Sequence, residues 1–208
     1  RREPVALEGR SYARDSDYQL TGSVVSAPGY FAAFGVAPLQ GRDFTTTDRP
    51  ESEPIALVNE SFVRRFLAGE EAVGRRIRMG GASSQEPWRT IVGVVPDLYL
   101  SGPDDRNPEG VYIPLAHSPQ RFASVILRTS GDPLALTASV RGAVAAIDPD
   151  LPIYHVSSLA GAIHDETWFY RLFGAVFTIL GSVALVLASV GLYGVMAFSV
   201  KRRTREVG

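Results

Sequence analysis

The chain has 208 residues, a formal net charge of −1 at pH 7 and 45% hydrophobic residues, a balance typical of a folded globular protein. The near-neutral charge argues against a nucleic-acid surface, because such a surface needs a basic stripe and the one dense basic run is residues 201–205. The absence of cysteine excludes disulfides, thiol catalysis and cysteine-ligated metals, although it does not fix the compartment.

The start of the chain is expected to hold one strand and one short helix. Residues 1–20 are polar, carry charges of both signs and lack a sustained period, so they are interpreted as an irregular lead-in or a truncated start. The β-rich run at 20–26 predicts a strand, and Tyr30, Phe31 and Phe34 after Pro28 predict a short helix.

The middle of the chain predicts four strands and one helix. A strand at 55–58 enters a helix whose N-cap is Asn59 and which ends near Gly69. Three further strands are expected at 75–79, 88–95 and 111–115, where β-forming residues lie between glycine and proline breaks. The residues between the last two strands favour turns and predict an exposed loop.

A βαβ unit is expected next. Residues 124–129 predict a strand, and Asp132 is the expected cap of a helix that begins at Pro133 and has an apolar stripe ending at Ile147. A second strand is expected at 153–157. Such units commonly occur in split βαβ, ferredoxin-like sandwiches.

Residues 172–200 predict a transmembrane helix, because they carry no charged side chain and exceed the roughly 20 apolar residues that cross a bilayer. The stretch is longer than the lipid core requires, so it should tilt or continue above the lipid as a stalk. Basic residues beside a membrane helix stay in the cytoplasm, and they are concentrated after this helix. Residues 1–170 are therefore expected outside the cytoplasm.

One face of this helix has small side chains, which would let another helix backbone come close. Its members are Gly174, Thr178, Gly181, Ala184, Ala188 and Gly191. We favour packing within a multi-helix membrane domain, although glycine and alanine are also simply common in membrane helices.

Two groups of residues flank the helix, and each has two interpretations. Trp168, Phe169 and Tyr170 form either an aromatic belt at the membrane interface or a packed end of the outer domain. The basic tail is either a topological stop signal or the start of a segment that contacts another protein.

Motifs for catalysis are absent from the sequence, including the phosphate-binding loop, the nucleophile elbow and the zinc-protease helix. His155, His164, Asp165 and Glu166 could be arranged as metal ligands, but their spacing fits no tight pair, and ordinary histidines are the simpler interpretation. Asp104 and Asp105 lie in a turn-rich stretch and more often stabilise turns than act as acid and base. No catalytic, cofactor-binding or metal-binding residue is assigned, and no cofactor is expected.

Several stretches together resemble the MacB-like periplasmic core domain joined to an FtsX-like permease helix, in the ABC transporter permease family and close to its acidobacterial type. The matching stretches cover nearly all of residues 21–208 in family order and include "VSAPGYFAAFGVAPLQGRDFTTTD", "PIALVNESFVRRF", "RTIVGVVPD", "VRGAVAAIDPDLPI" and "GLYGVMAFSVKRRTREVG".

The resemblance implies an α+β fold class for the extracytoplasmic part, followed by one transmembrane helix, and it implies a division of the chain. An extracytoplasmic core at 21–168 would contain porter-like βαβ parts at about 21–39 and 121–168, with a small strand-rich inserted part at about 40–120. A stalk and transmembrane helix at 169–200 and a cytoplasmic stub at 201–208 would follow. Further chain is expected on both sides, with the start of the domain and a first membrane helix before residue 1.

The mechanism that the resemblance implies is transmission of motion from cytoplasmic ATP hydrolysis to the outer domain. The protein would be a non-catalytic permease subunit in the bacterial inner membrane that exports an antimicrobial, peptide or lipoprotein-type substrate. Its partners would be an ABC-type ATPase, other permease helices or a second permease copy, a possible periplasmic adaptor and membrane lipid, but no nucleic acid. Residues for topology and coupling are Lys201, Arg202, Arg203, Thr204, Arg205, Glu206 and Gly208.

Two functions of other classes stay open. A single-span sensor or adaptor would bind a ligand outside and signal through its basic tail. A membrane-tethered enzyme would need a cleft with convergent titratable groups, which the sequence does not indicate.

Overall fold

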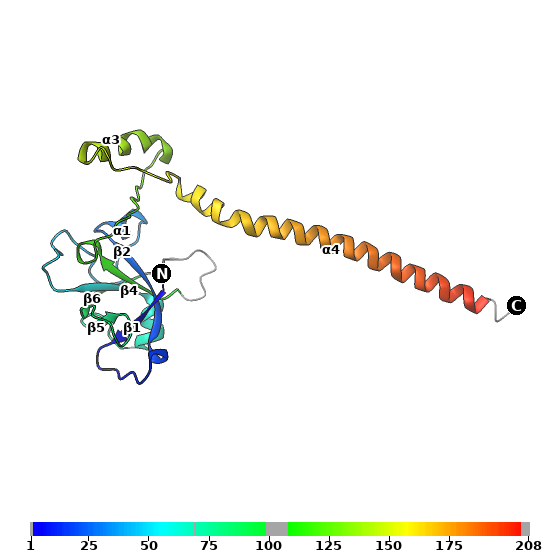
Figure 1. Cartoon of the computed structure of the whole chain (residues 1–208), viewed down its shortest axis with the longest axis horizontal. Coiled ribbons are helices and arrows are strands. Elements are labelled where there is room, and N and C mark those ends of the chain that lie inside the picture. The colour runs from blue at the N-terminus through cyan, green and yellow to red at the C-terminus, as the bar shows by residue number, and fades with distance from the viewer. Residues whose placement is uncertain (1, 69, 99–107, 205–208) are drawn as a thin grey trace. The chain divides into compact units, whose positions relative to one another are not determined.

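The structure is a computed structural model that describes residues 2–68, 70–98 and 108–204. By its internal contacts the chain divides into two compact units, Arg1–Pro133 and Leu134–Gly208. Each unit is described by itself. Figure 1 gives the element labels used below.

The first unit contains a seven-stranded sheet. Its strands are β1 (Arg2–Leu7), β2 (Gln19–Ser26), β3 (Gln40–Gly41), β4 (Ile55–Asn59), β5 (Arg76–Met79), β6 (Arg89–Val95) and β7 (Gly110–Pro114). They are ordered β3-β6-β4-β7-β2-β1-β5. The β2–β7 and β4–β6 pairs are parallel, and the other pairs are antiparallel.

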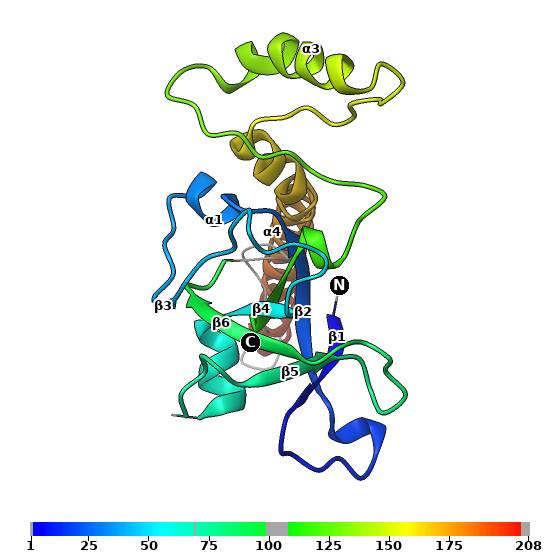
Figure 2. The ribbon, with the colours of Figure 1, turned by 90° about the vertical axis from the view of Figure 1, so that its left-hand side faces the viewer.

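An additional pairing closes this sheet into a barrel. β5 pairs not only with β1 but also with the start of β6, through Arg76 with Thr90 and Ile77 with Arg89. β6, β4, β7, β2, β1 and β5 therefore form a ring, and β3 pairs with the end of β6 outside it. Figure 2 shows the crossing strands of this barrel. Closure removes most of the free strand edges that would otherwise expose unpaired backbone groups.

Short helical segments complete the first unit. They are η1 (Asp15–Asp17), α1 (Tyr30–Ala33), α2 (Glu60–Phe62), its π-helical continuation η2 (Val63–Leu67), and η3 (Leu115–His117). η2 ends at Ala68, whose φ of 38° is left-handed, a conformation that commonly ends a helix.

Two apolar clusters lie on opposite faces of β4 and β7, because side chains alternate along a strand. One contains Val58 and Val111 with Phe62 and Phe66 of the α2–η2 segment. The other contains Leu57 with Tyr112 of β7 and Phe31 of α1. This double burial explains why every residue of β4 and of β7 is buried.

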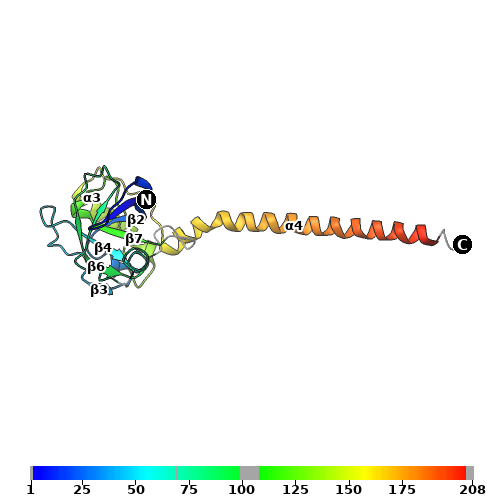
Figure 3. The same ribbon diagram turned by 90° about the horizontal axis from the view of Figure 1, so that it is seen from below.

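The second unit is helical. After η4 (Pro133–Leu136), α3 spans Thr137–Ile147 and α4 spans Leu159–Thr204. Within its own unit α3 has no buried residue. α4 has 46 residues, and Figure 3 shows it as one unbroken helix.

The structure confirms the α+β class and most expected elements. The strands at β2, β4, β5, β6 and β7 and the helical segments α1, α2–η2 and η4–α3 lie within about two residues of their predicted positions. Asn59 is the N-cap of α2, as predicted, because its side chain accepts a hydrogen bond from the Phe62 N–H.

Two expectations about elements were wrong. Residues 2–7 are not an irregular lead-in but the strand β1, which pairs with β2 and β5. Residues 124–129 and 153–157 form no strand, because no strand among the described residues pairs with them. β2 lies in the same sheet as β4 to β7.

Candidate functional site

Helix α4 contains the segment most clearly related to function. Phe173–Tyr193 is a 21-residue stretch long and apolar enough to cross a membrane, and its side chains are exposed. A helix satisfies its backbone hydrogen bonds internally, so it can leave water when its side chains are apolar. Exposed Leu, Val, Ile and Phe side chains over six turns of helix suit lipid or other helices, not water.

The six residues of the small-residue face all lie within this span and are exposed. An added Cβ on Gly174, Gly181 or Gly191 would meet no atom within 4 Å, so their small size is not required by contacts within the described chain. At about 100° per residue, Phe177 and Leu185 lie in the same arc, so the small residues form a stripe interrupted by larger ones.

The hydroxyl groups on this helix are satisfied within it. Thr178 Oγ1 donates to the Gly174 carbonyl at 2.8 Å, and Ser182 Oγ donates to the Thr178 carbonyl at 2.7 Å. Ser189 makes the same bond to Leu185. These polar groups can therefore enter an apolar environment without an outside partner.

The expected coupling residues lie at the end of α4 and beyond. The backbone of Lys201, Arg202, Arg203 and Thr204 is helical, so the helix continues past the apolar stretch into the basic run. Arg205, Glu206 and Gly208 lie outside the described residues. The side chains of Trp168, Phe169 and Tyr170 also lie outside what the structure describes, although their backbone is part of α4.

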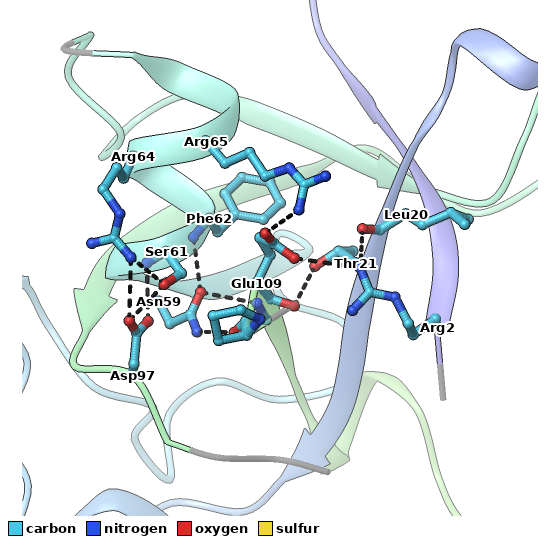
Figure 4. A network of polar contacts seen from close by, with 12 residues as sticks. Arg2, Leu20, Thr21, Asn59, Ser61, Phe62, Arg64, Arg65, Asp97 and Glu109 are labelled. Atoms are coloured by element: carbon cyan, nitrogen blue, oxygen red, sulfur yellow. Dashed lines mark hydrogen bonds and ion pairs between the residues drawn. The ribbon is translucent and has the colours of Figure 1, made fainter. Parts of the chain in front are cut away.

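The barrel contains a buried polar network beside α2, drawn in Figure 4. Asn59 is fully buried at the end of β4. Its Oδ1 accepts hydrogen bonds from the Phe62 N–H at 3.0 Å and the Gly110 N–H at 2.9 Å. Its Nδ2 donates to the Pro108 carbonyl at 2.5 Å. One side chain thus caps a helix and attaches β7 to it.

Glu109 links the same region to the first two strands. Its carboxylate, 5% exposed, pairs with Arg65 at 2.5 Å and with Arg2 at 3.3 Å. Its backbone carbonyl accepts hydrogen bonds from Thr21 Oγ1 at 3.1 Å and from the Gly22 N–H at 2.8 Å. Two arginines can neutralise a carboxylate that burial alone would disfavour.

Asp97 makes the third connection, at the other end of the segment between β6 and β7. Its carboxylate accepts hydrogen bonds from the Ser61 N–H at 2.9 Å and the Ser61 hydroxyl at 2.6 Å. Arg64 lies 3.6 Å from the same carboxylate. Both ends of that segment, at Asp97 and at residues 108–110, are therefore attached to the start of α2.

This network is suited to holding the chain in place. Its two carboxylates are paired with arginines, and its Ser61 hydroxyl bonds to a carboxylate with no histidine beside it among the described residues. Catalysis would need a nucleophile, a base and a site for substrate between them.

The residues considered for metal binding or catalysis are not brought together. Among the residues searched within the described chain, no group of three or more His, Cys, Asp or Glu could hold a metal ion. His155 lies in the irregular stretch before α4, with a left-handed φ of 50°. The side chains of His164, Asp165 and Glu166 and all of Asp104 and Asp105 lie outside the described residues.

Glu109 and Asp97 were not identified from the sequence. Both lie beside strands, Asp97 two residues after β6 and Glu109 directly before β7. A single charged residue next to a buried apolar strand is the signal that could have indicated them, since such a residue must find a partner. Which partner it finds depends on β1, whose strand character was not recognised.

Comparison with known proteins places these features in context. Residues 3–147 match the model of the MacB-like periplasmic core domain. Over 189 residues the chain is 24% identical to the macrolide export ATP-binding/permease protein MacB of Aggregatibacter actinomycetemcomitans, covering 86% of this chain and 28% of that protein. Over 191 residues it is 24% identical to the pyoverdine export ATP-binding/permease protein PvdT of Pseudomonas putida, covering 84% and 27%.

Two solved structures are also similar. One is the periplasmic region of MacB from Actinobacillus actinomycetemcomitans, with a TM-score of 0.46, 16% identity and coverage of 71% of this chain and 63% of that one. The other is a permease domain from Porphyromonas gingivalis, with a TM-score of 0.46, 18% identity and coverage of 78% and 77%. The chain spans 28% of the length of the first curated relative, so it corresponds to one part of such a protein.

Proposed function

The chain belongs to the family of MacB-like periplasmic core domains, and we propose that it transmits motion driven by cytoplasmic ATP hydrolysis to an extracytoplasmic domain of an ABC-type export permease. A periplasmic domain and a candidate membrane helix fit a protein of the bacterial inner membrane. Catalysis of ATP hydrolysis would belong to a separate domain or partner.

The continuity of α4 is the observation that supports this proposal most directly. The helix starts at Leu159, about four turns before the apolar span begins at Phe173, and continues to Thr204. At about 1.5 Å per residue the 21-residue span covers roughly 32 Å, close to the hydrocarbon thickness of a bilayer. A helix without a break can transmit a displacement from one of its ends to the other.

The charges at the two ends of α4 support an orientation with the C-terminal end in the cytoplasm. Lys201, Arg202 and Arg203 follow the apolar span, whereas Arg171 alone lies just before it. Basic residues are retained on the cytoplasmic side. We therefore propose that the barrel lies in the periplasm and that residues 201–208 meet the ATPase partner.

The small-residue face would be the surface on which other permease helices, or a second permease copy, pack. Small side chains allow close backbone approach, and the internally satisfied hydroxyls of Thr178 and Ser182 remove the cost of burying them there. A periplasmic adaptor would contact the outer domain. The relatives are named as macrolide and pyoverdine export proteins, and an antimicrobial, peptide or lipoprotein-type substrate is our proposal for this chain.

The division into a porter-like part and an inserted part stays a prediction. Val125 and Leu127 are 72% and 53% exposed, as expected of a β-forming segment that has no neighbour to pair with in the described chain. We propose that residues 121–168 belong to the porter-like part and pair with chain beyond residues 1–208. Slow hydrogen exchange at 125 and 127 in the full-length protein would support this pairing, and fast exchange would contradict it.

A break in α4 tests the transmission of motion. Thr167→Pro removes one backbone donor and clashes with the preceding turn, which kinks or breaks a helix at a cost of about 3 kcal/mol. In the full-length protein the variant should still bind its ATPase but should lose ATP-driven transport, whereas Thr167→Ala should resemble the wild type. Equal transport by both variants would rule out a rigid lever.

Orientation can be tested independently, because the chain has no cysteine. Thr46→Cys, in an exposed part of the barrel unit, should react with a membrane-impermeant maleimide in spheroplasts. Thr204→Cys should react only after the membrane is permeabilised. The reverse pattern would overturn the proposed orientation. Co-purification of an ATPase with the intact protein would separate a permease from a single-span sensor.

A further inference from the structure

A buried arginine in the barrel has hydrogen-bond donors that the described chain does not satisfy. Arg89 is the first residue of β6, and 3% of its side chain is exposed. Its Nη2 lies 3.0 Å from a carboxylate oxygen of Glu86. Its Nε and Nη1 are covered and have no partner among the described residues. A buried donor left unpaired costs about 1–3 kcal/mol, more when charged, so an acceptor from outside the chain would be stabilising.

Arg89 lines a pocket with a volume of about 280 Å³. We call this the Arg89 pocket, and its residues are Pro50, Pro54, Glu86, Pro87, Arg89 and His117. Proline has no backbone N–H, so half of the lining residues offer apolar rings without a competing backbone donor. The pocket therefore combines a cationic donor with an apolar wall.

His117 provides a second unpaired polar atom in the same pocket. Its Nε2 lies 2.8 Å from the Arg49 carbonyl and 3.1 Å from Ser52 Oγ, and the Ser52 hydroxyl itself donates to that carbonyl. Nε2 therefore has only acceptors around it and carries a hydrogen. Its Nδ1 is buried and has no partner in the described chain. Nδ1 is then a hydrogen-bond acceptor, so a carboxylate in this pocket would pair with Arg89 and not with His117.

We propose that the Arg89 pocket binds a small organic monocarboxylate. A guanidinium and a carboxylate form strong charge-assisted hydrogen bonds, and the three prolines would contact the carbon skeleton. A single negative charge matches the one arginine of the pocket once the Glu86 carboxylate has turned away from it. At about 30 Å³ per water, the volume holds roughly nine water-sized groups, which is the size of benzoate.

Glu86 is the group that the ligand would displace. Its side chain is 54% exposed, in contrast to the buried Arg89, so it can turn into solvent while the guanidinium stays fixed. Turning away frees Nη2, so the ligand carboxylate would take the place of Glu86 on the guanidinium. Glu86 therefore competes with the carboxylate, and its removal should strengthen binding.

A larger neighbouring pocket, with a volume of about 520 Å³, shares Glu86 and Arg89 and also contains Gln120. Gln120 does not line the Arg89 pocket. Substituting Gln120 therefore distinguishes the two pockets.

The test is a titration of the purified full-length protein in detergent with benzoate at constant ionic strength, followed by calorimetry and ligand-observed NMR. Benzamide, the neutral compound of the same shape, and inorganic phosphate are titrated in parallel. Benzoate should bind at least about tenfold more tightly than either. Equal binding of benzoate and benzamide, or preference for phosphate, would overturn the proposal.

Three variants locate the site. Arg89→Met keeps the apolar stem and should reduce benzoate affinity about tenfold or more. Glu86→Gln, which retains Arg89, should increase the affinity about threefold and keeps the proposal testable if the arginine variant does not fold. Gln120→Ala should leave it unchanged. Unchanged or weaker binding by Glu86→Gln, or loss of binding by Gln120→Ala, would contradict the assignment to the Arg89 pocket. None of these measurements depends on transport.

Discussion

Asn59 and Gly110 are joined across two strands by a hydrogen bond of 2.9 Å, from the Gly110 N–H to the Asn59 Oδ1. The same oxygen caps α2 through the Phe62 N–H, and the Asn59 amide donates to Pro108. The end of β4, the start of α2 and the start of β7 are thus held by one side chain with no exposed surface.

Asn59→Ala should therefore destabilise the barrel unit by about 3 kcal/mol, because it leaves two N–H groups and one carbonyl unpaired in a buried position. Asn59→Ser can still cap α2 and should recover about 1 kcal/mol. Denaturant unfolding followed by tryptophan fluorescence measures both. A loss below about 1 kcal/mol in the alanine variant would show that water replaces these bonds.

The Glu109 pairs should contribute more to stability than a comparable surface pair. Glu109→Gln removes a carboxylate that is 5% exposed and leaves Arg65 and Arg2 without it, so we expect a loss of about 1–2 kcal/mol. The control is Glu8→Gln, which removes an exposed pair with Arg76 and should cost less than about 0.5 kcal/mol. Equal effects in denaturant unfolding would mean that burial does not strengthen the Glu109 pairs.

Two glycines allow β3 to lie against β6. A Cβ on Gly93 would lie 2.5 Å from the Arg42 carbonyl oxygen, and one on Gly41 would lie 2.1 Å from the Val92 carbonyl oxygen. Because both obstacles are backbone atoms, Gly93→Ala should destabilise the unit by about 2 kcal/mol or more.

The matched control for this glycine is in α3. An added Cβ on Gly142 meets nothing within 4 Å, and alanine is favoured over glycine inside a helix, so Gly142→Ala should stabilise α3 by up to about 1 kcal/mol. Thermal unfolding of both variants gives the signs. If Gly93→Ala and Gly142→Ala shifted the melting temperature in the same direction, this explanation would be contradicted.

Asp48 gives a pH dependence with a defined direction. Hydrogen bonds from the Arg42 guanidinium lower the pKa of Asp48 below its ordinary value of 3.8, against the raising effect of burial. Two of these bonds measure 2.9 and 2.8 Å. A lowered folded-state pKa adds stability at pH values above the ordinary pKa of the unfolded state. This stability is lost as the pH falls through the folded-state pKa.

Asp48→Asn should therefore cost about 1–2 kcal/mol at pH 7 and progressively less below about pH 4. The difference between the two proteins is the quantity to measure, because burial raises the pKa of the nearby Asp43 and gives an opposite slope to the wild type alone. A difference that stays constant from pH 7 to about pH 2 would exclude this pair as its source.

The small-residue face can be tested with one large side chain on each side of α4. Gly181→Leu adds bulk to the face, whereas Val183 lies about 200° further around the helix, so Val183→Leu adds bulk on the opposite side. The first variant should reduce co-purification of the assembled permease about tenfold, and the second should retain it. Equal co-purification with both variants would mean that the small residues reflect only the usual composition of a membrane helix and not a packing surface.

The sequence by itself determined the local elements and the membrane helix. Strands such as β4 and β6 and the N-cap at Asn59 were predictable, because alternation, capping and breakers act over a few residues. The uncharged run that contains Phe173–Tyr193 was also sufficient to predict the membrane helix, since transfer of a helix into a membrane depends on the summed polarity of its side chains.

Only the tertiary structure decided the barrel and its polar network. β1 carries charges at Arg2 and Glu3 and gives no β signal by itself, yet it pairs with two strands and places Arg2 beside Glu109. Conversely, residues 124–129 have a β-like sequence but no partner in the described chain, and they form no strand. A strand requires hydrogen bonds from a neighbour distant in sequence, so its existence is decided by topology and not by its own residues.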